Sequence, residues 1–435
     1  MTQAARPRPR TVLPARGSDA AAVERELVER RAGDEDPRAT LSDRWLNDRG
    51  LLIDDGALEV ARAAYRLFMP KNNSWPPVLR MEHDLVEIAL DLFHGSADAA
   101  GSITTGGSES LFLAIAAALA HARERRNGGP SNPEVLLADT GYPAAEKFAR
   151  YLGYRVRRVA TDTSFAADPD AIAAAIGPDT VMLIGSHPSW PHGVCDPIPD
   201  LARLAVERAL WLHVDACVGG FLAPFLVELG QPLPAFDFSV PGVASISADF
   251  HKYGYSPKGV SGVFFRDRRL AANQTFTFDD WAAGLYRSPV FTGTRSGGAI
   301  AAAWAVARYL GRDGYRRRAA QVARARQAIV ELVEAEPGLR LLGRPHLGTV
   351  AIGGEIIEAV ADRFLACGWT AGRLQRPAGL QLVLGPFRDE IIDLLTADLR
   401  AAVADGGGPR GPTNAIYSDE ILDVPGSLSY REAVA

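Results

Sequence analysis

Short apolar runs alternate with amphipathic segments between residues 134 and 249, and this alternation constrains the fold more than any other feature of the 435-residue sequence. Strand-length apolar runs separated by helices imply right-handed crossovers and a mainly parallel sheet covered by helices on both faces. We therefore expect an α/β fold with a mainly parallel central sheet. The predicted strands lie at 134–139, 155–161, 180–186, 211–216 and 244–249.

The sequence on either side of this region differs in composition and periodicity, and these differences predict that the chain has three parts. Residues 1–70 begin with a basic, proline-rich stretch and continue with helical periodicity, so we expect a tail followed by a helical arm. Residues 71–305 would form the large domain. After residue 305, a long helical pattern precedes further strand-like and helical segments, which predicts a smaller α+β domain over 306–435 with an irregular tail rich in glycine and proline.

Composition and charge exclude several classes of function. The formal net charge of -5 gives no reason to expect nucleic acid or an anionic membrane surface as a partner. The histidines and the scattered Cys195, Cys217 and Cys367 form neither a metal-binding pattern nor a disulfide framework. The longest apolar run, 111–120, is shorter than the ~20 residues that a bilayer requires, and the N-terminus lacks the apolar core of a secretory signal. We expect a cytoplasmic protein without a membrane span or a metal.

Residues 245–265 read SISADFHKYGYSPKGVSGVFF and carry two lysines, Lys252 and Lys258, in a turn rich in glycine and aromatic residues. A lysine that follows a strand in a partly apolar pocket can lose its proton, because burial disfavours the ammonium form. The amine is then a nucleophile that can form a Schiff base with the aldehyde of pyridoxal 5′-phosphate. The alternative is that both lysines are solvated loop residues.

A glycine-rich turn precedes a strongly helical run in GSITTGGSESLFLAIAAALA, residues 101–120. Gly106 and Gly107 let the backbone approach a ligand closely. The free amides and the dipole of a helix that begins near Ser108 would attract an anion such as a phosphate. The alternative is an ordinary helix whose first turn is capped by a hydroxyl side chain.

A second turn of this kind, with Gly293 and Thr294, precedes an alanine-rich helix and predicts another anion contact. Arg295 follows it directly. Because the planar guanidinium suits both carboxylates and phosphates, Arg295 is a candidate for binding the substrate. The alternative is a surface arginine without a ligand.

Polar side chains follow several predicted strands, where ligands of parallel sheets bind. Ser186 and Asp215 each end such a strand. A buried carboxylate needs a cationic partner, and the protonated ring nitrogen of pyridoxal phosphate would be one for Asp215. His213 and Cys217 could point to the same side as Asp215 if the strand continues, which would bring both to the cofactor. The alternative role of Asp215 is to cap a helix.

Five motifs, in this order, resemble those of the sphingosine-1-phosphate lyases within the group II pyridoxal-phosphate decarboxylase superfamily. The resemblance extends from about residue 75 to residue 384. It implies the pyridoxal-phosphate-dependent transferase-like fold, fold type I, in a homodimer with active sites at the subunit interface. The motifs are TTGGSES, SHPSWPHGVCDPIPD, HVDACVGGF, SISADFHKYGYSPKG and TGTRSGG.

The resemblance also implies roles for individual residues. Lys252 would be the Schiff-base lysine, Asp215 the partner of the ring nitrogen, and Cys217 the residue beneath the ring. Other matching positions would surround the phosphate or the pocket. They are Gly107, Ser108 and Lys258 at the phosphate, Gly293 and Thr294 reaching the partner subunit's site, and Ser247 and His251 in the pocket.

Two segments differ from the family's pattern, and both would lie on the substrate side. Where the family usually has a histidine over the cofactor ring, this sequence has Tyr142, a poorer proton carrier near neutral pH because its reference pKa is ~10. Residues 68–74, FMPKNNS, lack the family's asparagine followed by a histidine–proline pair.

The predicted reaction is cleavage of a carbon–carbon bond in an amine substrate. We expect retro-aldol release of an aldehyde from an amino alcohol that resembles a sphingoid-base phosphate; the alternative is decarboxylation of an amino acid. Lys252, His251 or Tyr142 could return the proton as a general acid. A cofactor-binding protein without turnover would be expected to lack Lys252 or Asp215, and both are present.

Overall fold

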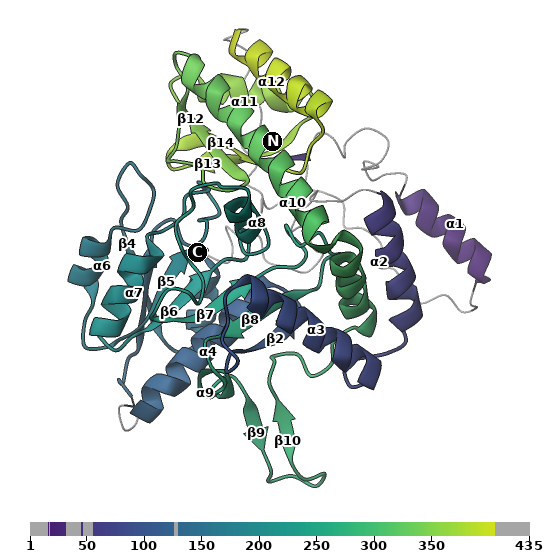
Figure 1. Ribbon diagram of the computed structural model, residues 1–435, viewed down its shortest axis with the longest axis vertical. Coiled ribbons are helices and arrows are strands. Elements are labelled where there is room, and N and C mark those ends of the chain that lie inside the picture. The colour runs from purple at the N-terminus through teal and green to yellow at the C-terminus, as the bar shows by residue number, and fades with distance from the viewer. Residues whose placement is uncertain (1–15, 17, 32–44, 47–54, 126–128, 405–435) are drawn as a thin grey trace, which may run out of the picture. The chain divides into compact units, whose positions relative to one another are not determined.

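The computed structural model describes residues 16, 18–31, 45–46, 55–125 and 129–404 (Figure 1). The chain divides into two compact units, Met1–Asp43 and Arg44–Ala435. The first contains helix α1 (Ala20–Arg31), which begins where the Asp19 carboxylate accepts a 2.8 Å hydrogen bond from the Ala22 amide. An aspartate at this position satisfies an otherwise free amide of the first turn. All that follows concerns the second unit.

A seven-stranded sheet forms the centre of the second unit, in the order β2-β8-β7-β6-β5-β3-β4. Strands β3 to β7 run parallel, and β8 runs antiparallel to both of its neighbours. This arrangement confirms the predicted mainly parallel sheet. The strands are β2 (Ala100–Thr104), β3 (Glu134–Ala138), β4 (Arg155–Val159), β5 (Thr180–Ser186), β6 (Trp211–Asp215), β7 (Val243–Ala248) and β8 (Ser261–Phe265).

Helices cover both faces of this sheet, as the long apolar strands require. Leu136 of β3 packs in one core with Leu201, whereas its neighbours Val135 and Leu137 pack in another core with Leu111. Successive strand residues point to opposite faces, so a strand covered on both sides is apolar at every position. The helices of these layers are α3 (Pro76–Leu92), α4 (Gly107–Arg125), α5 (Ala144–Leu152), α6 (Pro169–Ala175), α7 (Ile198–Glu207) and α8 (Ala223–Glu228).

A smaller five-stranded sheet, in the order β1-β13-β14-β12-β11, has a core of its own. Its strand β1 comes from the predicted N-terminal arm and pairs in parallel with β13. Helices α11 (Ile357–Ala366) and α12 (Asp389–Ala404) pack in this part. The strands are β1 (Trp45–Leu46), β11 (Arg340–Leu341), β12 (Thr349–Gly353), β13 (Thr370–Gln375) and β14 (Ala378–Val383).

The long helix α10 (Gly297–Ala335) connects the two sheets, so the predicted domain boundary at 305/306 falls inside a helix. At Gly311 its backbone leaves the helical region, with φ 54° and ψ 179°, a conformation that glycine adopts without a side-chain clash. Helix α2 (Asp55–Phe68), from the predicted arm, packs against α10. The predicted tail from residue 406 and most of the first 54 residues lie outside the described residues.

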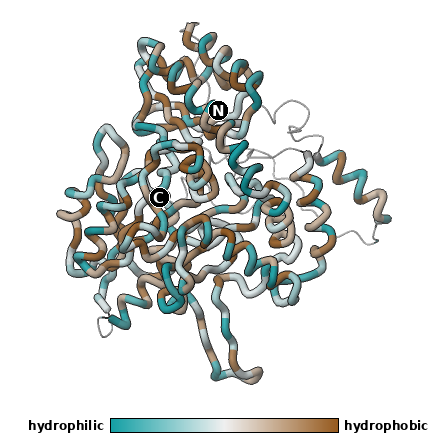
Figure 2. Tube along the Cα trace, in the orientation of Figure 1, coloured by the Kyte–Doolittle hydropathy of each residue, from teal (hydrophilic) through white to brown (hydrophobic). Residues whose placement is uncertain are grey.

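The remaining elements are helix α9 (Arg268–Ala272) and the hairpin of β9 (Phe276–Phe278) and β10 (Tyr286–Ser288). Figure 2 shows hydrophobic residues along the central strands, with hydrophilic residues recurring on the helices around them. None of the helices in the described ranges is both long enough and apolar enough to cross a membrane.

Candidate active site

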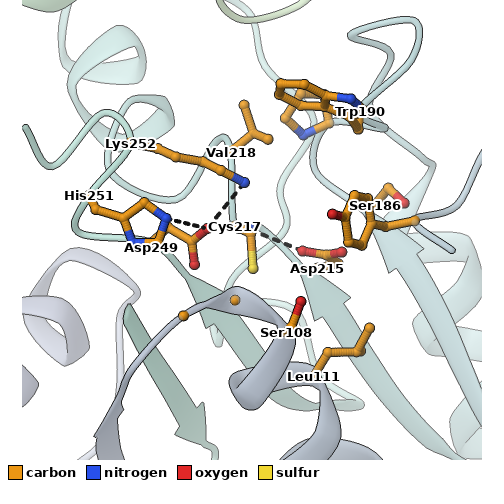
Figure 3. A pocket seen from close by; sticks show the side chains of 14 residues that line it. Ser108, Leu111, Ser186, Trp190, Asp215, Cys217, Val218, Asp249, His251 and Lys252 are labelled. Carbon is orange, nitrogen blue, oxygen red and sulfur yellow. Dashed lines mark hydrogen bonds and ion pairs between the residues drawn. The ribbon is translucent and has the colours of Figure 1, made fainter. Parts of the chain in front are cut away.

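A cavity of about 230 Å³ lies where the carboxyl ends of β5, β6 and β7 meet the start of α4 (Figure 3). This is the edge at which parallel sheets bind their ligands. The lining combines glycines, hydroxyls, two carboxylates, a histidine and a lysine. It consists of Gly106, Gly107, Ser108, Leu111, Tyr142, Ser186, Pro188, Trp190, Asp215, Cys217, Val218, Asp249, His251 and Lys252.

Lys252 stands in the turn after β7 and points its amine into the cavity (Figure 3). Its Nζ lies 3.1 Å from Oδ2 of Asp249 and 5.6 Å from the centre of the Trp190 ring. The turn itself is closed by a hydrogen bond from the Lys252 amide to the Asp249 carbonyl, 3.2 Å long. The amine is therefore held by a carboxylate three residues before it.

Asp249 is a buried anion that this lysine compensates, with only 2% of its side chain exposed. Burial alone would raise the pKa of Asp249, but Lys252 and His251 hold that pKa below its ordinary value. Its other oxygen, Oδ1, accepts no hydrogen bond from the described residues. A Cβ at Gly107 would lie 2.8 Å from this oxygen, so a glycine is needed where α4 begins.

Asp215 ends β6 and lines the cavity beside Cys217. Its Oδ1 accepts hydrogen bonds from the Cys217 amide at 3.1 Å and from the Ser247 hydroxyl at 3.4 Å, which fix the carboxylate. Burial, followed by the charge of Asp215, raises the pKa of the Cys217 thiol well above its usual value. The thiol therefore stays protonated and packs as a small apolar group.

His213 and Ser247 lie beneath the cavity and do not line it. The ring of His213 is fully buried, with Nδ1 2.8 Å from Ser245 Oγ and Nε2 3.1 Å from Ser247 Oγ, and burial lowers its pKa to about 3. His213 is thus separated from the cavity, and its predicted contact with the cofactor stays a prediction. The cavity lies beyond the end of β6, and position 213 is two residues deeper in the sheet.

The first turn of α4 borders the cavity with Gly106, Gly107 and Ser108, so its free amides and positive dipole end face it. Tyr142 and Ser186 also line the cavity. Ser186 is anchored through its amide, which donates a 2.7 Å hydrogen bond to Asp196.

Arg295 is not among the residues that line the cavity, and its predicted role at the substrate stays a prediction. Its Nη1 donates 2.6 Å hydrogen bonds to Oε1 of Glu82 in α3 and to the carbonyl of Ile103 in β2, and the side chain is buried. A buried guanidinium needs a partner charge, and Glu82 provides it. The guanidinium therefore joins α3 to β2.

Three further predicted residues lie outside the cavity lining. Gly293, Thr294 and Lys258 are exposed. Burial has the largest effect on the pKa of His251 and lowers it. Asp249 acts to raise this pKa, whereas the nearby charges of Lys258 and Lys252 lower it further. Residues 68–74 lie beside the Gly293 turn, because the Asn73 amide donates to the Arg295 carbonyl at 3.2 Å.

Four residues of the cavity belong to motifs of the sequence but were given no role by sequence reasoning: Pro188, Trp190, Val218 and Asp249. Trp190 and Asp249 lie near the lysine amine. Asp249 precedes Lys252 by three positions, a spacing at which two side chains of one turn can pair. Trp190 belongs to SHPSWPHG. The charge spacing could have revealed Asp249, whereas nothing in the sequence relates Trp190 to a lysine 62 positions away.

The cavity's residues fit pyridoxal 5′-phosphate. Lys252 offers an amine for the aldehyde, and Asp215 offers a fixed carboxylate for the ring nitrogen. The start of α4 offers amides for the phosphate. Among the described residues, no group of three histidine, cysteine or acidic side chains is arranged to hold a metal ion.

Comparison with known proteins agrees with this fit. Residues 67–352 match the family described as "Pyridoxal-dependent decarboxylase conserved domain". The sphingosine-1-phosphate lyase of Oryza sativa is 34% identical, with 82% of this chain and 68% of that protein covered. Sphingosine-1-phosphate lyase 1 of Rattus norvegicus is 36% identical, with 76% of this chain and 58% of that protein covered. The chain thus spans about three fifths to two thirds of the length of these relatives.

Solved structures agree as well. A sphingosine-1-phosphate lyase of Burkholderia pseudomallei K96243 is 35% identical and superposes with a TM-score of 0.86 over 92% of this chain and 93% of that chain. The glutamate decarboxylase of Lactobacillus brevis, 21% identical over 92% of this chain and 96% of that chain, shares the fold with a TM-score of 0.77. The chain therefore belongs to the pyridoxal-dependent decarboxylase family, and within it to the sphingosine-1-phosphate lyase-like members.

Proposed function

We propose that this protein is a pyridoxal 5′-phosphate-dependent lyase that breaks the Cα–Cβ bond of a phosphorylated amino alcohol resembling a sphingoid-base phosphate. The observation that carries the proposal is the Lys252 amine, which lies 3.1 Å from Asp249 in a cavity that also contains Asp215 and the start of α4. The names of the relatives supply the substrate class.

When bound, pyridoxal phosphate supplies an electron sink for the bond that breaks at the amino carbon. Lys252 would hold the cofactor through its amine. The Asp215 carboxylate, which the Cys217 amide orients at 3.1 Å, would hold the proton of the ring nitrogen. The amides at Gly107 and Ser108 would hold the phosphate, and the protonated Cys217 thiol would give the ring an apolar contact.

Retro-aldol cleavage needs a base for the substrate hydroxyl proton and an acid that returns a proton to the amino carbon. The bond between Cα and Cβ breaks, and the Cβ side leaves as an aldehyde. Lys252, once free, can accept and return protons within the cavity. His251 donates from Nδ1 to the Val260 carbonyl at 3.0 Å, so its Nε2, which faces Asp249, is the atom that gains or loses a proton.

Decarboxylation of an amino acid is the second candidate, and Tyr142 favours it because this residue replaces the family's histidine in the cavity lining. An amino-acid substrate also needs a cation for a side-chain or α-carboxylate. With Arg295 bound to Glu82, the described lining contains Lys252 and no arginine. A phosphate ester needs such a cation as much as a carboxylate does, so the lining does not separate the two substrates, and the names of the relatives favour the retro-aldol reaction.

We also propose a homodimer in the cytoplasm, in which Gly293 and Thr294 reach the partner subunit's cofactor phosphate. These two residues are exposed, and the neighbouring β9–β10 hairpin exposes Phe276, Trp281 and Tyr286. Exposed apolar groups gathered on one element are typical of a protein interface. Sedimentation equilibrium of the purified protein tests the dimer, and a monomer at micromolar concentration would contradict it.

The function is tested by incubating the purified protein and pyridoxal 5′-phosphate with dihydrosphingosine 1-phosphate and, separately, with a panel of amino acids. Mass spectrometry of a long-chain aldehyde and phosphoethanolamine supports the first reaction, whereas released carbon dioxide supports the second. Lys252→Ala serves as the control and should give neither product. If borohydride does not fix the cofactor to Lys252 of the unaltered protein, both reactions are ruled out.

A further inference from the structure

Glu109, in the first turn of α4, is a buried carboxylate surrounded by hydrogen-bond donors. Its Oε2 accepts from the Thr105 amide at 2.7 Å and from the Thr105 hydroxyl at 2.6 Å. Its Oε1 accepts from the amides of Phe291 and Thr292 at 3.0 and 3.3 Å. Both oxygens are thus used, one on each side of the side chain.

The two oxygens of this carboxylate bind residues at different distances along the sequence. The bond to Thr105 is a local capping contact, in which an acidic residue of the first turn reaches back to a free amide. The bond to Phe291 joins residues 182 positions apart in the sequence. Glu109 therefore ties the residue just before Gly106 to the residues just before Gly293.

Further contacts hold both ends of segment 291–295. At its start, the ring centre of Phe291 lies 4.9 Å from that of Phe112 in α4. At its end, Arg295 donates a hydrogen bond to the carbonyl of Ile103 in β2. Strand β2 leads into the Gly106–Ser108 turn, and α4 leaves it. The segment is thus held by both elements that flank the turn: by β2 through Ile103, and by α4 through Glu109 and Phe112.

We infer that Glu109 is a positioning residue that couples the Gly106–Ser108 turn to segment 291–294, so that cofactor binding at the turn orders the segment. The inference rests on the proposed function, in which this turn holds the cofactor phosphate and Gly293 and Thr294 reach the partner subunit's site.

Replacement by glutamine separates this role from simple space filling. A carboxylate accepts hydrogen bonds at both oxygens, whereas the amide of glutamine has a donor at one end. Glu109→Gln therefore places an NH₂ group against Thr105 or against the amides of Phe291 and Thr292, while size and shape are retained. Glu124→Gln is the matched control, because it removes the same charge from an exposed position of the same helix.

The experiment is hydrogen–deuterium exchange of the full chain, with and without pyridoxal 5′-phosphate, read by mass spectrometry on peptides covering 286–296. In the unaltered protein, the cofactor should slow exchange at 291–292 about tenfold. In Glu109→Gln this response should disappear, and the dissociation constant of the cofactor should rise roughly ten- to one-hundredfold, as for the loss of charge-assisted hydrogen bonds. Glu124→Gln should behave like the unaltered protein.

Several outcomes would overturn the inference. If the unaltered protein binds the cofactor but exchange at 286–296 does not change, there is no coupling, and the proposed function still stands. If the unaltered protein does not bind the cofactor, the proposed function fails first. If Glu109→Gln binds the cofactor weakly but the cofactor still slows exchange at 286–296, Glu109 stabilises only the Gly106–Ser108 turn and does not couple it to the segment. If Glu109→Gln does not fold, Thr105→Val, which removes only the hydroxyl donor, takes its place. A cofactor response at 286–296 that is as large in Thr105→Val as in the unaltered protein would then overturn the inference.

Discussion

The carboxylate of Asp249 lies 3.1 Å from the amine of Lys252, inside a cavity at the ends of the parallel strands. The pair is more than a surface ion pair, because 2% of the Asp249 side chain and 14% of the Lys252 side chain are exposed. Little water competes for either group there, so the carboxylate fixes the position of the amine.

Asp249→Asn tests this pairing. Without the anion, the Lys252 amine is no longer held in place, so the rate of cofactor attachment should fall roughly tenfold across its pH profile. Turnover should fall roughly tenfold or more, because the amine is no longer held. Stopped-flow absorbance of pyridoxal phosphate mixed with cofactor-free protein, from pH 6 to 10, provides the measurement.

Asp237→Asn is the matched control for Asp249→Asn, because Asp237 is a buried carboxylate that pairs with His94 outside the cavity. This variant should leave the profile unchanged. An unchanged profile in Asp249→Asn as well would contradict the role of Asp249.

Gly107→Ala should destabilise the cofactor-free protein by about 1–3 kcal/mol, the usual cost of overpacking. The added Cβ would lie 2.7 Å from Cys217 Sγ and 2.8 Å from Asp249 Oδ1. At the neighbouring Gly106 a Cβ meets no atom within 4 Å, so Gly106→Ala should change stability by less than about 0.5 kcal/mol. Urea unfolding of both variants gives the comparison, and equal losses would show that the close approach at Gly107 is unimportant.

Acid should destabilise the protein through three buried histidines and the half-buried His346, all neutral in the folded protein. Burial lowers the pKa of His187 and His213 to about 3, and that of His192 and His346 to about 4. An unfolded histidine has a pKa near ~6.5, so the unfolded chain binds more protons below that pH. The stability that these histidines contribute is therefore complete above about pH 6.5 and is lost as the pH falls toward 3–4, by about 2 kcal/mol per histidine at pH 5.

Urea unfolding at pH 7 and pH 5 measures this loss. Asp196 opposes it in part, because burial raises its pKa to about 6 and the folded protein takes up that proton first. His187→Phe removes one titrating group and keeps the stack on Phe236, whose ring centre lies 4.1 Å away. The difference in stability between the two pH values should shrink by about 2 kcal/mol in this variant. An undiminished difference would mean that His187 does not titrate as its burial implies.

Arg295→Met should destabilise the protein by about 3–5 kcal/mol, because it leaves the buried Glu82 carboxylate without its partner. Glu82→Gln should have a similar effect, and the double variant should lose less than the sum, since each change already breaks the same pair. Urea unfolding gives the three values. A variant of normal stability with a raised KM would support the predicted role of Arg295 at the substrate.

The sequence predicted most of the central sheet and much of the cavity. The period of the apolar runs indicated strands covered on both faces, and the rule that ligands bind at strand ends brought Ser186, Asp215 and Lys252 to one edge. The anion-binding turn before α4 followed from its two glycines and the dipole of the helix behind it. These features depend on residues close in the chain, for which local periodicity and backbone preferences suffice.

The sequence did not reveal the contacts between distant residues. Arg295 and Glu82 are 213 positions apart, and nothing in either segment indicates that α3 carries the partner of that guanidinium. His213 was expected at the cofactor because side chains alternate along a strand. This alternation predicts the face of the sheet on which a side chain lies, but not its distance from the end of the strand. The bond between Glu109 and Phe291 was likewise invisible in the sequence.

The sequence by itself determined the fold class and the cofactor, and it predicted the lysine that would bind that cofactor, because each follows from a local pattern or from motifs in a fixed order. Only the tertiary structure decided which charges neutralise one another: Lys252 with Asp249, Arg295 with Glu82. The physical reason is that a buried charge must find a partner in space, and the packing of helices and strands, rather than proximity in the chain, determines which partner lies within reach.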